Sequence, residues 1–199
     1  MKGKRFASLA CVLAGLLSLY LGAAALSPAQ LLDALLSGPG STAGRIFWFA
    51  RLPRTAGCLL AGAALSTAGC VIQNVLSNPL ASPNIIGVNA GAGLAVTICC
   101  ALGCLSGWAL AGAAFGGAFL AVVLVSLAAK LVGASRTTVI LSGVAVNAFL
   151  GAVSDAVTNL VPEAGVMSGD FRVGGFGAVV PARLVPAGIL IGLALGAVF

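Results

Sequence analysis

The longest uncharged stretch of the chain limits its fold more than any other sequence feature. Residues 55–129 contain no Asp, Glu, Lys or Arg over 75 positions. A helix needs about 20 apolar residues to cross a hydrocarbon core of about 30 Å, so this stretch holds about three membrane spans and short turns. Only 7% of the 199 residues are charged, against about 25% in soluble domains. A water-soluble enzyme is therefore excluded.

The remaining uncharged runs supply the other membrane spans. The predicted spans are approximately residues 6–26, 55–76, 86–106, 108–129, 138–160 and 184–199. The chain also contains 28 glycines, and small residues let membrane helices approach closely. We therefore predict an all-α integral membrane protein, a polytopic helical bundle formed by one domain over residues 1–199. About six transmembrane helices are present, and the sixth is shorter than the hydrocarbon core.

The amino-terminal segment has the basic start of a secretory signal peptide. Its apolar run of 21 residues exceeds the 7–15 expected of such a peptide, which favours a retained first helix. Basic residues are divided equally between the two sides of the membrane, five on each. The cluster Lys2, Lys4 and Arg5 before the first helix favours a cytoplasmic N-terminus.

Six cysteines and no histidine limit the metal and redox chemistry of the chain. The cysteines are Cys11, Cys58, Cys70, Cys99, Cys100 and Cys104. All lie in apolar stretches and none forms a CxxC pair, so neither a zinc site nor a disulfide framework is predicted. We expect them to act as small buried apolar residues. No metal, cofactor, nucleotide or nucleic acid is expected to bind this chain.

Residues 44–54 combine aromatic and basic side chains. Phe47, Trp48 and Phe49 beside arginines are typical of the membrane–water interface. Arg51 and Arg54 are three residues apart, so a helical turn places them on one face. The pattern fits interfacial anchoring, and it also fits a cationic docking site for an acidic partner.

Two predicted spans carry polar faces. In the second span Gln73 shares a narrow sector with small residues, which favours helix packing and leaves pathway lining as the alternative. In the fifth span Asn147 and Ser154 lie within a sector of about 60°, with Asp155 at its edge. An ionisable residue inside a span is a functional-site hypothesis, but Asp155 lies close to the helix end. Pathway lining and helix packing are equally compatible with this face.

Three sequence blocks together resemble one family. Residues 51–93 read RLPRTAGCLLAGAALSTAGCVIQNVLSNPLASPNIIGVNAGAG, and residues 137–157 read TTVILSGVAVNAFLGAVSDAV. A third block, at residues 168–179, reads SGDFRVGGFGAV. In this order the blocks resemble FecCD-type permeases, the membrane subunits of ABC importers for iron–siderophores, haem and vitamin B12.

The resemblance implies an assembly and assigns roles to residues. Such permeases have about ten helices, work as a pair on two ATPase subunits, and receive substrate from a soluble binding protein. They lie in the bacterial cytoplasmic membrane with the N-terminus inside. The implied docking residues are Arg51 and Arg54, the implied pathway residues are Asn147, Ser154 and Asp155 with Gln73 as a further candidate, and the implied cytoplasmic gate region is Ser135, Arg136 and Thr137.

The family pattern continues beyond the last residue of this sequence. A segment that docks on the ATPase and four more helices follow the sixth helix in the family, so we expect the chain to be a fragment, a truncated gene product or an incomplete record. ATP hydrolysis is expected on a partner subunit, and the chain itself is not expected to be an enzyme. The alternatives are an ion-coupled secondary transporter, with Asp155 as its one candidate residue, and a non-functional membrane fragment.

Overall fold

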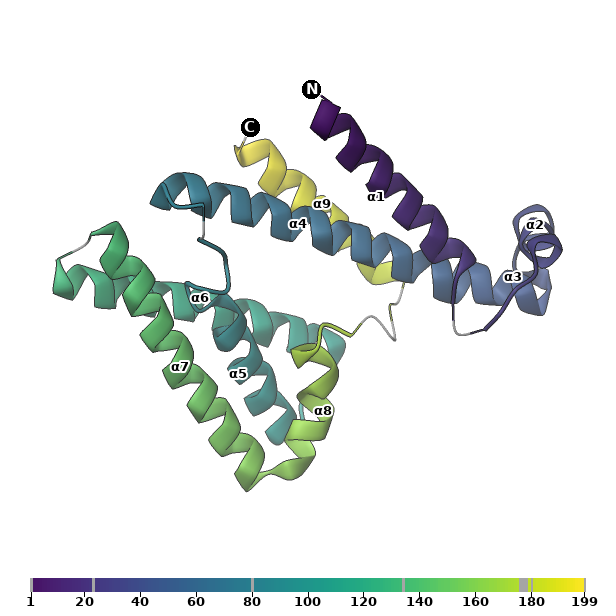
Figure 1. Cartoon of the computed structure of the whole chain (residues 1–199). Coiled ribbons are helices and arrows are strands. Elements are labelled where there is room, and N and C mark those ends of the chain that lie inside the picture. The colour runs from purple at the N-terminus through teal and green to yellow at the C-terminus, as the bar shows by residue number, and fades with distance from the viewer. Residues whose placement is uncertain are drawn as a thin grey trace. The chain divides into compact units, whose positions relative to one another are not determined.

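A computed structural model of the chain describes residues 2–22, 24–79, 81–133, 135–175, 179 and 181–198 (Figure 1). Every regular element among these residues is a helix, which confirms the all-α prediction. Within the described ranges, three helical stretches are long and apolar enough to cross a membrane, namely Thr42–Leu76, Gly107–Val132 and Arg136–Leu160. The chain divides into two compact units, Met1–Ala64 with Phe176–Phe199, and Leu65–Gly175. The single permease domain expected from the sequence stays a prediction.

The first unit contains a hairpin of helices and short turns. Its elements are α1 (Lys2–Tyr20), α2 (Pro28–Leu36), η1 (Gly38–Gly40), α3 (Thr42–Ile46), η2 (Phe47–Arg51), the first half of α4 (Leu52–Leu76) and α9 (Pro181–Val198). Helix α2 begins in a capping box, in which Ser27 and Gln30 each accept a hydrogen bond from the other's backbone N–H. This box satisfies two of the donors that a helix start leaves unpaired.

A π-helical turn joins α3 to α4. At its end the Leu52 N–H donates to the carbonyl of Phe47, five residues back. The next residue, Pro53, has no N–H to donate and its ring crowds the preceding turn. The wide turn lets one continuous helical stretch, Thr42–Leu76, pass through this proline. Such π-turns are frequent at functional sites, and this one contains Arg51.

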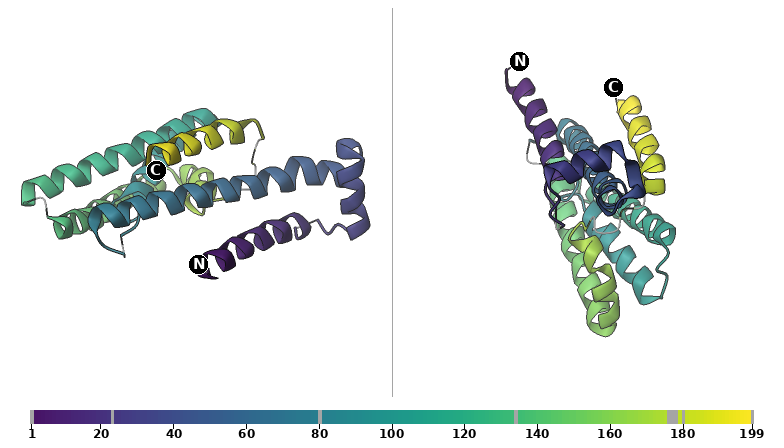
Figure 2. Two further views of the ribbon diagram at one scale, coloured as in Figure 1. Left: turned by 90° about the horizontal axis from the view of Figure 1, so that it is seen from above. Right: turned by 90° about the vertical axis from the view of Figure 1, so that its right-hand side faces the viewer.

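The second unit is a bundle around one central helix. It consists of the second half of α4 together with α5 (Val88–Ala101), α6 (Gly107–Val132), α7 (Arg136–Leu160) and α8 (Pro162–Arg172). Helix α5 packs against α6, α7 and α8, which stay together in all three views (Figures 1 and 2). Where α5 crosses α6, a Cβ on Gly91 would lie 2.3 Å from the Gly117 carbonyl oxygen. Only glycines allow this close approach.

The structure differs from the predicted spans at three places. Helix α1 ends at Tyr20 instead of near residue 26, and the capped helix α2 begins at Pro28. Helix α5 ends at Ala101, because Gly103 turns the chain with a φ of +76°. Helix α8 begins at Pro162, a residue suited to a first helical turn, in a segment for which the sequence predicts no helix.

Candidate functional site

A polar groove lies within the second unit, between α5, α7 and α8. Its volume is about 820 Å³. The residues that line it are Leu65 of α4, Asn84 of the loop before α5, the α5 residues Asn89, Ala90, Ala92, Gly93 and Leu94, the α7 residues Val144, Asn147, Ala148, Gly151 and Ser154, and Phe171, Arg172, Val173 and Gly174 at the end of α8. Three asparagines, a serine and an arginine thus face one concave surface that also has apolar walls.

Asn147 connects this groove to the irregular segment before α5. Its side-chain Nδ2 donates to the carbonyl oxygen of Asn84 over 3.2 Å. One turn earlier on α7, Gly143 packs so closely on this segment that a Cβ would lie 2.2 Å from the Ile85 carbonyl oxygen. The segment between α4 and α5 is therefore held by α7, and the rest of the Asn147 amide faces the groove.

Ser154 belongs to a buried hydroxyl cluster that joins three helices. Its Oγ donates to Thr97 Oγ1 on α5 over 3.4 Å, and Thr97 Oγ1 lies 3.4 Å from Ser168 Oγ on α8. Thr97 also bonds to the Gly93 carbonyl oxygen over 2.9 Å. The three residues are 0–5% exposed, and Thr97 connects Ser154, which borders the groove, to Ser168 of α8.

Asp155, which lies near the end of α7, forms an ion pair with Arg172, the last residue of α8. The carboxylate oxygen and the guanidinium nitrogen are 3.2 Å apart, and the two side chains are 64% and 46% exposed. The sequence placed Asp155 near a helix end, and the ion pair agrees with an exposed position. Its partner Arg172 also lines the groove, and no sequence motif assigns that residue a role.

The other residues assigned from the resemblance lie apart from the groove. Gln73 is exposed on α4 and is absent from the groove lining. Ser135 caps α7, where its side-chain oxygen accepts a hydrogen bond from the Thr138 N–H over 3.0 Å. Arg136 and Thr137 follow as the first two residues of that helix, and both are exposed. Their proposed roles stay predictions.

The two arginines of the RLPR motif have different surroundings in the first unit. Arg51 is 7% exposed, and its guanidinium donates to the carbonyl oxygens of Leu19 (2.7 Å), Tyr20 (2.6 Å) and Ala24. These oxygens lie at and after the end of α1, where helix carbonyls lack partners. Arg54 is exposed and makes no hydrogen bond or ion pair within the described part of the chain. The shared helical face therefore does not give the two side chains the same environment.

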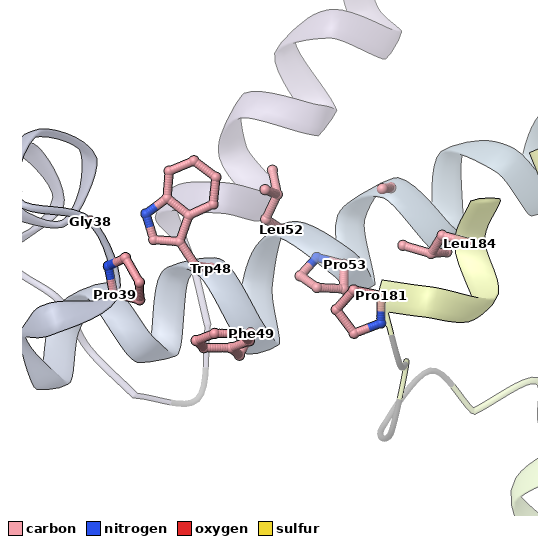
Figure 3. Close-up of a pocket in the computed structure, with 9 residues that line it drawn as sticks. Gly38, Pro39, Trp48, Phe49, Leu52, Pro53, Pro181 and Leu184 are labelled. Carbon is pink, nitrogen blue, oxygen red and sulfur yellow. The ribbon is translucent and has the colours of Figure 1, made fainter.

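An apolar groove of about 490 Å³ runs along the start of α4 in the first unit (Figure 3). Trp48, Phe49, Leu52 and Pro53 line it from η2 and α4, and Pro181 and Leu184 line it from α9. The Trp48 Nε1–H donates to the Ala34 carbonyl oxygen over 3.0 Å. With that N–H engaged, this groove presents hydrocarbon surface, as expected of an interfacial aromatic segment.

Comparisons with known proteins agree with this architecture. The FecCD transport family model matches residues 10–199. The ferric enterobactin transport system permease FepD of Escherichia coli K12 is 37% identical over 155 residues, which cover 76% of this chain and 46% of FepD. The vitamin B12 import system permease BtuC of Salmonella paratyphi A is 39% identical over 150 residues, 73% of this chain and 43% of BtuC. The chain thus spans less than half the length of these curated relatives.

A solved structure has the same fold. A metal-chelate type ABC transporter in an inward-facing conformation matches with a TM-score of 0.73 and 24% sequence identity, over 94% of this chain and 56% of the other. Among the described residues, no group of three or more Cys, Asp or Glu side chains is placed to hold a metal ion. From the family match over residues 10–199, the chain belongs to the FecCD transport family.

Proposed function

We propose that this chain is part of the membrane-spanning permease subunit of a binding-protein-dependent ABC importer. The family match over residues 10–199 carries this proposal, and the relatives named for ferric enterobactin and vitamin B12 import support a large chelate as substrate. The cargo would be an iron–siderophore, or a related chelate such as haem or cobalamin. A second permease subunit, ATPase subunits and an extracytoplasmic binding protein would complete the assembly in the cytoplasmic membrane, with the N-terminus inside.

The polar groove is the proposed wall of the translocation pathway. Asn147 and Ser154 line it, and the Asp155–Arg172 ion pair lies at its end. Amide and hydroxyl groups on an otherwise apolar surface bind a polar chelate weakly at many points, which suits passage better than tight binding at one point. Gln73 on α4 would face the pathway only in the assembled transporter.

The proposed docking site for the binding protein is centred on Arg54, and the proposed cytoplasmic gate on Ser135, Arg136 and Thr137. Arg54 has a free guanidinium for an acidic partner, whereas the Arg51 guanidinium is occupied by three carbonyl oxygens. Arg51 would then support docking by holding the segment that carries Arg54. Transport would follow alternating access driven by ATP hydrolysis on the partner subunit.

Uptake by the full-length transporter, reconstituted with its ATPase and binding protein, tests the pathway. Asn147→Trp should lower ATP-dependent uptake of an iron–siderophore at least about tenfold, because an indole at this position would obstruct the groove. Leu141→Trp, on the same helix but outside the groove lining, is the matched control and should retain uptake. Normal uptake by Asn147→Trp would refute the pathway assignment. Uptake that needs a proton gradient and no ATP would refute the ABC importer itself.

Docking is tested by measuring, at low salt, the affinity of the extracytoplasmic binding protein for vesicles that contain the reconstituted transporter. Arg54→Glu should weaken binding at least about tenfold, since reversing one charge in a complementary pair adds repulsion. Arg45→Glu provides the control, because Arg45 is also exposed and lies in α3 of the same helical stretch. Equal binding by the two variants would exclude Arg54 as the docking residue.

A further inference from the structure

The turn between α5 and α6 ends α5 in a Schellman motif. The Gly103 N–H donates to the Cys100 carbonyl oxygen, and the Cys104 N–H donates to the Cys99 carbonyl oxygen, both over 2.9 Å. Gly103 has a φ of +76°, the left-handed conformation that glycine adopts without steric cost. These two bonds and the left-handed glycine define the motif.

A Schellman motif brings together the side chains five residues apart at its two ends. Here both of those residues are cysteines, Cys99 and Cys104. The Cys99 thiol lies 3.4 Å from the Cys104 carbonyl oxygen, so the turn brings the first cysteine against the backbone of the second. Cys99 is half-buried and Cys104 is exposed, so reagents reach the pair. Cys100, by contrast, is 5% exposed and packs with Val96 and Ala164.

We propose that Cys99 and Cys104 form a dithiol site that closes to a disulfide by exchange with an oxidised disulfide donor. One cysteine thiolate attacks the donor, which forms a mixed disulfide and releases one thiol. The second cysteine attacks the mixed disulfide, so an S–S bond forms in the chain and the donor's other half leaves as a thiol. The donor gains the two electrons that the two cysteines lose, and both cysteine protons pass to solvent or to the released thiols.

The fold supplies the proximity that such an exchange requires. The turn holds Cys99 next to the backbone of Cys104 before reaction, and a short tether gives an effective concentration in the mM range. Cys99 and Cys104 are five residues apart and form no CxxC pair, so the sequence predicts small buried apolar residues here, whereas Cys104 is exposed in the structure. With the N-terminus inside, as proposed above, α5 runs outward and this turn faces the extracytoplasmic side, where disulfides persist.

Reaction with 2,2′-dithiodipyridine in lipid nanodiscs tests the site, because this disulfide crosses membranes and reaches either side. Two reactions compete for the second thiol, namely attack on the mixed disulfide and reaction with another reagent molecule. At about 0.1 mM reagent, the first should be at least about tenfold faster. The expected product is a Cys99–Cys104 disulfide that lacks two hydrogen atoms and carries no pyridyl group at either position. Chymotryptic peptides and their masses identify it, since residues 55–129 offer trypsin no Lys or Arg.

Three variants separate the proposed site from general thiol reactivity. Cys104→Ser should leave Cys99 with one stable pyridyl group, whereas Cys70→Ser, a control on α4, should close like the natural chain. Gly103→Ala should slow closure roughly fivefold or more, because a Cβ disfavours the left-handed turn. Two pyridyl groups on the natural chain, a disulfide that includes Cys100, or unchanged closure in Gly103→Ala would each overturn the proposal.

Discussion

Two arginines end helical segments in this molecule, and they hold their neighbours in different ways. Arg51 ends η2 and donates to three backbone carbonyl oxygens around the end of α1, in a junction where it is 7% exposed. Arg172 ends α8 and pairs with the Asp155 carboxylate of α7, with 46% of its side chain exposed. The first contact therefore joins a charge to backbone dipoles, and the second joins two solvated side chains.

This difference predicts that the contact made by Arg51 stays fixed and that the Asp155–Arg172 contact can open. The carbonyls at the end of α1 carry partial negative charge, and they stay in place as long as the helix does. Moving Arg51 away would leave both a buried cation and several carbonyls without partners, which is costly. Water replaces the Asp155–Arg172 contact at little cost, because exposed ion pairs contribute about 0–1 kcal/mol. The Asp155–Arg172 contact therefore contributes little to holding α8, which the buried Thr97–Ser168 contact and the buried Ala164 join to the bundle.

The largest effect is expected from removing the Arg51 guanidinium. Arg51→Met should lower the free energy of unfolding by about 3 kcal/mol, since charge-assisted hydrogen bonds contribute about 1.5–3 kcal/mol each and are not additive. Arg54→Met is the matched control, and its stability should lie within about 0.5 kcal/mol of the natural chain. Denaturant unfolding in detergent measures both. Equal stability of the two variants would show that Arg51 does not hold α1.

A smaller effect is expected at Gly22, over which the Arg51 guanidinium lies. A Cβ on Gly22 would be 3.1 Å from Nε of Arg51, and the guanidinium gives way only by lengthening its own hydrogen bonds. Gly22→Ala should therefore destabilise the chain by about 1 kcal/mol. In the Arg51→Met background the same change should cost nothing, and the double-mutant cycle measures this coupling. A cost that persists without Arg51 would place the strain elsewhere.

The residues in these two junctions show what the sequence predicts and what it leaves out. Helices α4, α6 and α7 follow from uncharged runs, and the polar face of α7 with Asn147 and Ser154 follows from helical spacing alone. The carbonyl partners of Arg51 lie 27 to 32 residues away, and Arg172 lies 17 residues from Asp155. Contacts between segments that fold together leave no local pattern, so the burial of Arg51 and the Arg172 ion pair required the structure.

The smallest effect on stability is expected at the Asp155–Arg172 pair, where exchanging the two charges sharpens the comparison. Asp155→Arg alone places like charges opposite each other and should destabilise the chain by about 0.5 kcal/mol, a value that allows for solvent screening at these exposures. The double variant Asp155→Arg with Arg172→Asp should recover most of this loss, because the attraction depends only on opposite signs. The same exchange at Arg51 has no counterpart, since a backbone carbonyl has no charge to reverse.

Unfolding measured at low and at high salt checks the pair, because an exposed pair loses its contribution as salt screens it. A loss above about 2 kcal/mol that salt does not reduce would make this junction as fixed as the one at Arg51.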